Sequence, residues 1–375
     1  MAAVESTLIV GGGTVGCALA TLLAAGGVEV EIAEIRQDWT VHGSGITLQG
    51  NALRVLRQVG VWPRVRELGF PFDGMGIRSH TGELLADLTD QRTGGPDLPA
   101  TVGMSRPRLA TVLSEAAVQA GAVVRLGTTV ETLRRDESGV DVTFDDGTAR
   151  RYDLVVGADG IRSHVRSLLG IDVVPQPTGL SIWRVQARRP PGLERTDICY
   201  DGPCHIAGYC PTGEETLYAY LVERSQDRTR MPRAEQLQTV RRLASGYHGF
   251  WDEIRDDLTD PSVLNHTAFE HLLVPPPWNR GRVVLVGDAA HACPPTLAQG
   301  AAMGLEDAAV LAELLLGSDR VAESLWAAFT ERRFARVRAV VDGSLQIVRW
   351  LLGDDTDADV PGLTGRVAEL VSEPA

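Results

Sequence analysis

A stretch near the C-terminal end of the sequence carries residues that could bind a polar ligand with an anionic end. It reads VVLVGDAAHACPPTLAQGAAMGLEDA, residues 283–308. Its first four residues predict a buried strand, and Gly287 ends that strand so that Asp288 lies just past it. From Gly300 onward the apolar spacing predicts a helix, whose start offers free N–H groups and a partial positive charge. The pattern indicates a ligand site, although an ordinary strand-to-helix turn would share it.

The amino terminus carries a second pattern of this kind. A strand at residues 7–10 leads into GGGTVG, in which Gly11, Gly13 and Gly16 form a G-x-G-x-x-G. A helix over residues 17–25 and a strand over 28–33 follow, and Glu34 stands eighteen positions after Gly16. Such glycines allow a tight turn and close approach to a diphosphate, and the terminal acid can hold both ribose hydroxyls. The unit predicts binding of an ADP half and fits NAD and FAD equally.

Two further places could face an anion. Residues 154–156 predict a strand that runs into Asp159 and then into a helix beginning at residues 161–166. Arg106 opens another predicted helix, where its charge opposes the helix dipole. A nearby diphosphate would explain that placement, and a solvated arginine is the alternative. Gly43 and Gly45 lie in a loop before a short helix, where they either let the backbone approach a ligand or belong to a plain loop.

The composition excludes several function classes. The 375 residues are 44% apolar and 23% charged, which predicts a soluble chain of one large or two ordinary domains. The net charge of 36 − 49 = −13 argues against nucleic acid or anionic membrane as the main partner. No membrane-length apolar run or signal segment is found, so we expect a cytoplasmic protein.

The residue types that are missing narrow the chemistry. The sequence has no lysine, which excludes a Schiff base and a P-loop lysine. It has no HExxH, and its five cysteines are scattered without a C-x-x-C pair. We therefore expect neither a catalytic metal nor a disulfide framework.

The elements that must position these residues follow from the remaining pattern. Residues 71–100 and 123–152 predict short strands with turns, and 176–279 predict an antiparallel sheet with one covered face, followed by a helical span at 234–254. Tyr218 and Tyr220 share one face of a strand and line either the core or a flat pocket. The residues after Ala308 predict amphipathic helices whose arginine faces we expect to be solvated.

A cofactor with two polar arms explains why a third ligand-type junction follows about 270 residues after the first. FAD has an ADP half, a ribityl chain and a flavin ring. Asp288 could accept hydrogen bonds from the ribityl chain, and the helix start at Gly300 could stabilise negative charge at the flavin N1–C2=O edge.

The segments GGGTVG with Glu34, GADGIRSHVR and GDAAHACPPTLAQGAAMGLEDA, in this order, resemble the class A flavoprotein monooxygenases, the para-hydroxybenzoate hydroxylase-like family. The resemblance implies an α/β fold. It consists of a Rossmann-type FAD-binding domain (residues 1–70, 100–175 and 280–320), an inserted antiparallel-sheet substrate domain (71–99 and 176–279) and a C-terminal helical segment (321–375).

The resemblance also implies an activity. FAD is bound noncovalently and reduced by NADH or NADPH, and its hydroperoxide with O2 hydroxylates an aromatic or similar electron-rich small molecule. Two alternatives stay open, because a fold does not determine chemistry: an FAD-dependent reductase or oxidase on the same scaffold, and a non-enzymatic flavin-binding protein.

Specific residues follow from the same resemblance. The expected cofactor-binding residues are Gly11, Gly13, Thr14, Val15, Gly16, Glu34, Arg36, Gly45, Arg106, Val130, Asp159, Asp288, Gly300, Ala301 and Ala302. The expected substrate-pocket residues are Trp183, Tyr209, Tyr218 and Tyr220, and the catalytic candidates are Arg184, His291 and Pro295. Arg184 either holds a substrate carboxylate or phenolate or forms a surface salt bridge. The chain departs from the family at Ala298, where glycine is frequent, and at Ala302, where asparagine is common.

Overall fold

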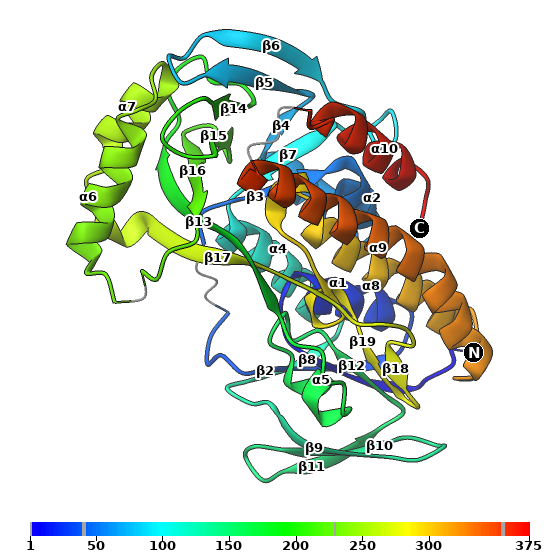
Figure 1. Ribbon diagram of the computed structural model, residues 1–375. Coiled ribbons are helices and arrows are strands. Elements are labelled where there is room, and N and C mark those ends of the chain that lie inside the picture. Colours follow the sequence, from blue (N-terminus) through cyan, green and yellow to red (C-terminus); the bar gives the residue numbers. More distant parts are fainter. Residues whose placement is uncertain (1, 40–42, 229, 354–356) are drawn as a thin grey trace.

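A six-stranded sheet carries the three strand-to-helix junctions (Figure 1). The computed structural model describes residues 2–39, 43–228, 230–353 and 357–375. The strands lie in the order β18-β19-β12-β1-β2-β8, and all neighbours are parallel except β18 and β19. Their bounds are β1 (Ser6–Val10), β2 (Glu29–Glu34), β8 (Val123–Leu126), β12 (Leu154–Gly157), β18 (Asn279–Arg280) and β19 (Val283–Leu285).

The order of these strands brings distant parts of the sequence together. β1, β12 and β19 are neighbours, and parallel strands end at the same edge of a sheet. The chain therefore leaves the sheet side by side at Gly11, Ala158 and Val286. Helix α1 (Thr14–Ala25) follows β1 and packs against both α4 (Arg106–Gln119) and α8 (Gly300–Leu316).

Two smaller sheets flank this layer. One has the order β3-β7-β4, with β3 (Ile46–Gln49), β4 (Phe70–Phe72) and β7 (Thr101–Met104), and the helices α2 (Gly50–Gln58) and α3 (Trp62–Leu68) lie between these strands in the sequence. The other is the meander of β9 (Val130–Arg135), β10 (Val140–Phe144) and β11 (Ala149–Tyr152). Strand β3 was not expected, because ITLQ is too short to show a strand period. Residues 41 and 42 of that loop lie outside the described residues.

An eight-stranded sheet forms the other half of the molecule, in the order β20-β17-β13-β16-β15-β14-β5-β6. The bounds are β5 (Gly74–Ser79), β6 (Leu84–Thr89), β13 (Gln176–Arg188), β14 (Thr196–Tyr200), β15 (Ile206–Pro211), β16 (Thr216–Arg224), β17 (Leu264–Leu273) and β20 (His291–Ala292). The antiparallel pairing expected for residues 176–279 is confirmed, and β14 also pairs in parallel with β5 of the earlier segment. Strand β20 lies within residues 280–320, which were expected to belong to the FAD-binding domain, yet it pairs with the end of β17 in this sheet.

The two faces of this sheet have different neighbours. Helices α6 (Arg233–Ala244) and α7 (Phe250–Asp257) cover one face over a core that contains Trp183 and Tyr209. The other face turns toward the six-stranded sheet and is partly covered by the end of α9 (Glu323–Gly353), whose Val348 packs against Leu180 and Val222. Helix α10 (Val360–Ser372) follows α9. No helix among the described residues is long and apolar enough to cross a membrane.

Arg333 and Arg336 of α9 are buried, which corrects the expectation that the arginines of this segment form a solvated face. The Arg333 guanidinium is 0% exposed and lies 2.7 Å from both Glu306 and Asp307 of α8. Arg336 lies 3.7 Å from Glu306 and donates to the carbonyl oxygens of Glu373 and Pro374. The helical period places arginines on two faces of α9, and only the packing of α8 reveals which face is buried.

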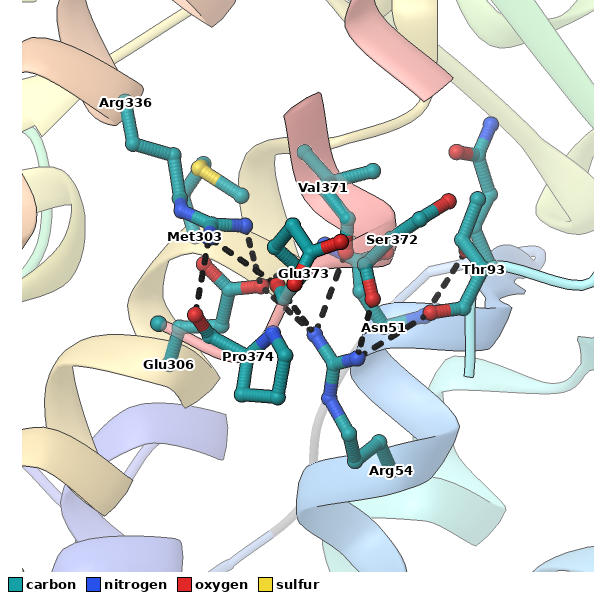
Figure 2. A network of polar contacts seen from close by, with 12 residues as sticks. Asn51, Arg54, Thr93, Met303, Glu306, Arg336, Val371, Ser372, Glu373 and Pro374 are labelled. Carbon is teal, nitrogen blue, oxygen red and sulfur yellow. Dashed lines mark hydrogen bonds and ion pairs between the residues drawn. The ribbon is translucent and has the colours of Figure 1, made fainter. Parts of the chain in front are cut away.

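The C-terminal tail is held by the same cluster (Figure 2). Arg54 of α2 donates to the carbonyl oxygens of Val371, Ser372 and Glu373, at 2.9–3.1 Å. It also lies 3.7 Å from Glu306. Helices α2, α8 and α9 and the tail therefore meet around one carboxylate.

We predict that Arg333→Met lowers the free energy of unfolding by about 3–5 kcal/mol, because it leaves the buried Asp307 and Glu306 without their main counter-charge. Urea denaturation followed by circular dichroism measures the change. The matched control is Arg338→Met on the same helix, where the Arg338–Asp342 pair is over 60% exposed on both sides, and we expect a change within about 0.5 kcal/mol. Equal losses in the two variants would contradict the assignment.

Candidate cofactor and substrate site

The first junction is shaped by two glycines that admit no side chain. Gly11 has φ +107°, and a Cβ on it would lie 2.5 Å from the Ala158 carbonyl oxygen. A Cβ on Gly16 would lie 2.0 Å from the Gly11 carbonyl oxygen. A Cβ on Gly13, at the N-cap of α1, would meet no protein atom within 4 Å. Packing therefore requires the outer glycines, whereas Gly13 lies where a diphosphate would approach the helix start, beside Thr14 and Val15.

Glu34 lies at the end of β2, where the sequence predicts a ribose contact. Its two carboxylate oxygens accept the backbone N–H groups of Gly12 at 2.8 Å and Arg36 at 3.0 Å. Each oxygen keeps a lone pair for a hydroxyl group. The indole N–H of Trp39 lies next to Gly12, is buried, and has no partner among the described residues. Trp39 thus presents a donor that fits an adenosine group, and it was not anticipated from the sequence.

The backbone that leads to Val130 passes beside Glu34. The N–H groups of Gly127 and Thr128 donate to the carbonyl oxygens of Arg36 and Glu34. Val130 itself is fully buried at the start of β9. It can only contribute packing or backbone groups to the adenosine end of the site.

The third junction packs directly on the first. The 3-10 helix η2 (Gly287–Ala289) begins at Gly287, with φ +58°. A Cβ there would lie 3.0 Å from Val15 Cγ2, and one on Gly304 of α8 would lie 2.5 Å from the same atom. Asp288 is exposed to solvent, yet the surrounding protein desolvates its carboxylate and raises its pKa. The Asp288 carboxylate is thus open to solvent but has protein on most sides, which places it in a cleft. An acceptor for a ribityl chain is expected in such a position.

A buried carboxylate behind the cleft holds this turn. Asp307 accepts the Gly287 N–H at 2.8 Å, lies 2.6 Å from His291 Nε2 and accepts from Arg333 at 2.7 Å. His291 is buried and its ring lies beside that of Trp278. The structure therefore places His291 among the residues that support the turn, and its catalytic role stays a prediction. Asp307 was missed, since an acid inside a predicted helix carries no distinctive signal.

The residues of the second junction, after β12, stabilise the start of a helix and the neighbouring turn. Asp159 accepts from Ser163 and from the backbone N–H groups of His164 and Val165 at 2.5–3.0 Å, which caps α5 (His164–Leu168). These bonds occupy the carboxylate that was expected to bind the cofactor. The helix also begins at His164, later than residues 161–166 suggested. Arg166 is buried and donates to the Ala289 carbonyl oxygen, so this junction supports the Asp288 turn.

The start of α8 lies beyond the 3-10 helix η3 (Pro295–Leu297). No side chain caps this start, so the N–H groups of Gly300, Ala301 and Ala302 can serve an anionic edge. Ala298 precedes it with φ +53°, a left-handed conformation that explains why glycine is frequent there in the family. Gln299 bonds to Gln49 and Asn51, which joins the start of α8 to β3 and α2. Pro295 is exposed in η3, and nothing in its contacts assigns it a catalytic role.

Two arginines face the cleft. The Arg106 side chain passes Gly43, donates to the Gly45 carbonyl oxygen at 2.9 Å, and stabilises the charged form of Asp288. Desolvation, together with the charge of Arg106, lowers the pKa of Arg184 to about 10. Within the part of the chain that the structure describes, neither guanidinium forms an ion pair with a carboxylate. Arg184 bonds to Thr267 Oγ1 at 2.9 Å, which excludes the surface salt bridge considered above.

The sheet face above the cleft carries two tyrosines. Arg184 pairs with Tyr220 in the β13–β16 register, and Tyr218 lies on the same face. The two tyrosine rings are 5.8 Å apart, and the Tyr218 hydroxyl lies 2.8 Å from Thr47 Oγ1 of β3. Burial raises the pKa of both phenols, so they stay neutral at pH 7. Gly45 is required for this contact, because a Cβ on it would lie 2.1 Å from Tyr218, and its approach to a ligand stays a prediction.

Trp183 and Tyr209 lie on the opposite face of the sheet. Trp183 donates to Glu223, and the Tyr209 hydroxyl donates to Asp197, within the core under α6 and α7. The expectation that they line the substrate pocket is therefore corrected. Trp183 adjoins Arg184 in β13, and Tyr209 is one residue off the site-facing positions of β15, so strand alternation turns both away.

Comparisons with known proteins agree with this geometry. A family model described as an FAD binding domain matches residues 5–344. Similar proteins include the putative FAD-dependent monooxygenase YetM of Bacillus subtilis, 29% identical over 94% of this chain and 95% of that protein. Another is 2-heptyl-3-hydroxy-4(1H)-quinolone synthase of Pseudomonas aeruginosa, 31% identical over 93% and 88%.

A solved structure shares the fold. Klebsiella pneumoniae HpxO complexed with FAD and uric acid has a TM-score of 0.85 at 21% identity, covering 99% of this chain and 97% of that one. The chain belongs to the FAD-binding-domain family and, within it, to the class A flavoprotein monooxygenases. It is an FAD-dependent monooxygenase that acts on a small molecule.

We predict that Glu34→Ala raises the dissociation constant for FAD about tenfold to hundredfold, because hydrogen bonds to a charged acceptor contribute about 1.5–3 kcal/mol. Titration of the apoprotein with FAD, followed by flavin fluorescence, measures the change. Glu29→Ala is the matched control, since Glu29 lies on the same strand with a 60% exposed side chain, and we expect it to leave the affinity unchanged. An unchanged affinity in Glu34→Ala would remove Glu34 from the site.

Proposed function

We propose that the protein hydroxylates a nitrogen heteroaromatic small molecule that carries an acidic ring oxygen, with NADH or NADPH as reductant. The observation that carries this proposal is the half-buried Arg184 side chain, which has no carboxylate partner among the described residues and lies on the sheet face with Tyr218 and Tyr220. Such a guanidinium favours an anionic oxygen. The quinolone synthase relative supports the ring class.

The two tyrosines would form the aromatic wall of the pocket. Stacking of flat rings on tyrosine favours an aromatic substrate over a flexible aliphatic one. Both phenols are neutral at pH 7, and the Tyr218 hydroxyl, which lies 2.8 Å from Thr47 Oγ1, is the one with a polar partner on this face. Bound FAD would supply the electron transfer from NAD(P)H and the activation of O2. The protein's own part is to orient the ring, hold its oxygen at Arg184 and exclude water.

The proposed reaction also bears on the location and the partners of the protein. The net charge of −13 argues against nucleic acid as a partner, and we propose a cytoplasmic location, where NAD(P)H is available. The rates of NADH and NADPH oxidation, measured separately, identify the nicotinamide nucleotide that the protein uses.

We predict that purified protein oxidises NADH or NADPH faster when a hydroxylated quinolone, pyridine or benzoate from a test panel is added. Under ¹⁸O2, mass spectrometry of the product should find one labelled oxygen atom. A dehydrogenated or reduced product without label would favour a reductase or oxidase on the same scaffold. No stimulation of flavin reduction by any member would favour a non-enzymatic protein.

We predict that Arg184→Met raises KM for a substrate with an acidic oxygen about tenfold to hundredfold, as expected for the loss of a charge-assisted hydrogen bond. Since the Arg184 pKa is about 10, the guanidinium is charged below that pH and loses its proton as the pH rises through it. Its contribution should be constant between about pH 7 and 9. Arg188→Met, on the same strand with an 81% exposed side chain, is the control. Equal KM values in the two variants would refute the role of Arg184.

A further inference from the structure

Three amide side chains, here called the amide cluster, meet at the start of α8. They belong to Gln49 at the end of β3, to Asn51 in the first turn of α2 and to Gln299, the residue before α8. Asn51 Nδ2 donates to Gln299 Oε1 at 3.0 Å, and Gln299 Nε2 donates to Asn51 Oδ1 at 3.3 Å. Gln299 Nε2 also donates to Gln49 Oε1. Because Asn51 is 0% exposed and Gln299 is 1% exposed, water does not compete for the bonds between them.

The amide cluster holds the turn that leads into α8. Gln49 Nε2 donates to the Leu297 carbonyl oxygen at 3.0 Å, so the residues on both sides of Ala298 are bonded to the cluster. Ala298 has φ +53°, a left-handed conformation that is unfavourable for a residue with a Cβ and persists only where the surroundings fix it. The direction of the first N–H groups of α8 therefore depends on these three side chains.

Asn51 also connects the cluster to a buried charge. Its Nδ2 donates to Glu306 Oε1 at 3.1 Å, within the network of Figure 2. Glu306 is 1% exposed and is itself held by Arg333 at 2.7 Å. The two amide N–H groups of Asn51 thus have two acceptors, as do those of Gln299. A buried polar network whose donors are all satisfied is rigid, so the start of α8 is fixed before any cofactor binds.

A rigid helix start matters for the cofactor because the flavin gains negative charge at its N1–C2=O edge when it is reduced. Free N–H groups at the start of a helix stabilise such a charge. They do so most when they already point at the place where the charge develops, since no reorganisation is then needed. A fixed start of α8 would therefore stabilise reduced FAD more than oxidised FAD, which raises the reduction potential of the bound cofactor.

We propose that Asn51 is a positioning residue for the flavin. Through its pair with Gln299 it holds the N–H groups of residues 300–302 toward the flavin N1–C2=O edge, and it thereby favours reduced over oxidised FAD. The inference rests on the predicted contact between the start of α8 and that edge. It is independent of the substrate, and Asn51 acts through Gln299 without touching the cofactor.

The midpoint potential of bound FAD tests this role without substrate or oxygen. The FAD-loaded protein is reduced stepwise under nitrogen beside a redox dye of known potential, and absorbance gives the ratio of oxidised to reduced flavin. Asn51→Ala should lower the preference for reduced FAD about tenfold, roughly the effect of one charge-assisted hydrogen bond, which equals about 30 mV for a two-electron couple. A merely structural role would weaken the binding of both forms equally, so an unchanged potential would overturn the proposal.

Asn279→Ala is the matched control, because Asn279 is a buried asparagine of β18 whose amide donates to a backbone carbonyl oxygen of its own turn. We expect this variant to keep the potential of the unmodified protein. If Asn51→Ala does not retain FAD, Gln49→Met takes its place, since Gln49 is only half-buried and its replacement removes the bond to Leu297. An unchanged potential in the FAD-loaded variant, or an equal fall in Asn279→Ala, would refute the role of the amide cluster. Because no oxygenation is measured, a failed ¹⁸O2 experiment leaves this result independent.

Discussion

One buried carboxylate, that of Asp307, determines the geometry of the cofactor cleft. It accepts from the Gly287 backbone, lies next to His291 and is paired with Arg333, so it joins η2, β20, α8 and α9 at a single point. A buried charge is stable only when such partners are in place. The interactions with His291 and Arg333 keep the carboxylate ionised by lowering its pKa, against the desolvation that raises it. The position of Asp288 in the cleft depends on this arrangement, because Asp288 directly follows Gly287, whose N–H donates to Asp307.

Close backbone contacts complete the cleft. The first and third junctions meet where Gly287 and Gly304 press on Val15, and the first and second meet where Gly11 lies on Ala158. Each contact leaves no room for a Cβ. The three junctions can act on one cofactor because β1, β12 and β19 are neighbours in a parallel sheet, so their ends lie along one edge.

The two faces of the substrate-facing sheet have different roles, because successive residues of a strand point to opposite faces. Residues on one face, including Trp183 and Tyr209, build the core under α6 and α7. Residues on the other face, including Arg184 and Tyr218, turn toward the FAD-binding half, where Tyr218 touches Thr47. A rigid core on one side thus holds the polar groups of the other side in position for a bound ring.

The sequence by itself determined the class of protein, because the signals were local. The glycines and Glu34 lie within one strand–helix–strand unit, the Asp288 turn and the start of α8 lie within another short stretch, and their order matched one family. Two of the five substrate-side candidates, Trp183 and Tyr209, could not be assigned in this way. Two adjacent residues of a strand face opposite sides, so only the register with β16 separated Arg184 from Trp183. The burial of Arg333 and the contacts of Asp307 depend on partners 16 to 27 positions away, which only the tertiary structure brings within hydrogen-bond distance. Motifs made of residues close in the sequence can be recognised from the sequence alone. Packing between segments that are distant in the chain decides which face of an element is buried and which charges are paired.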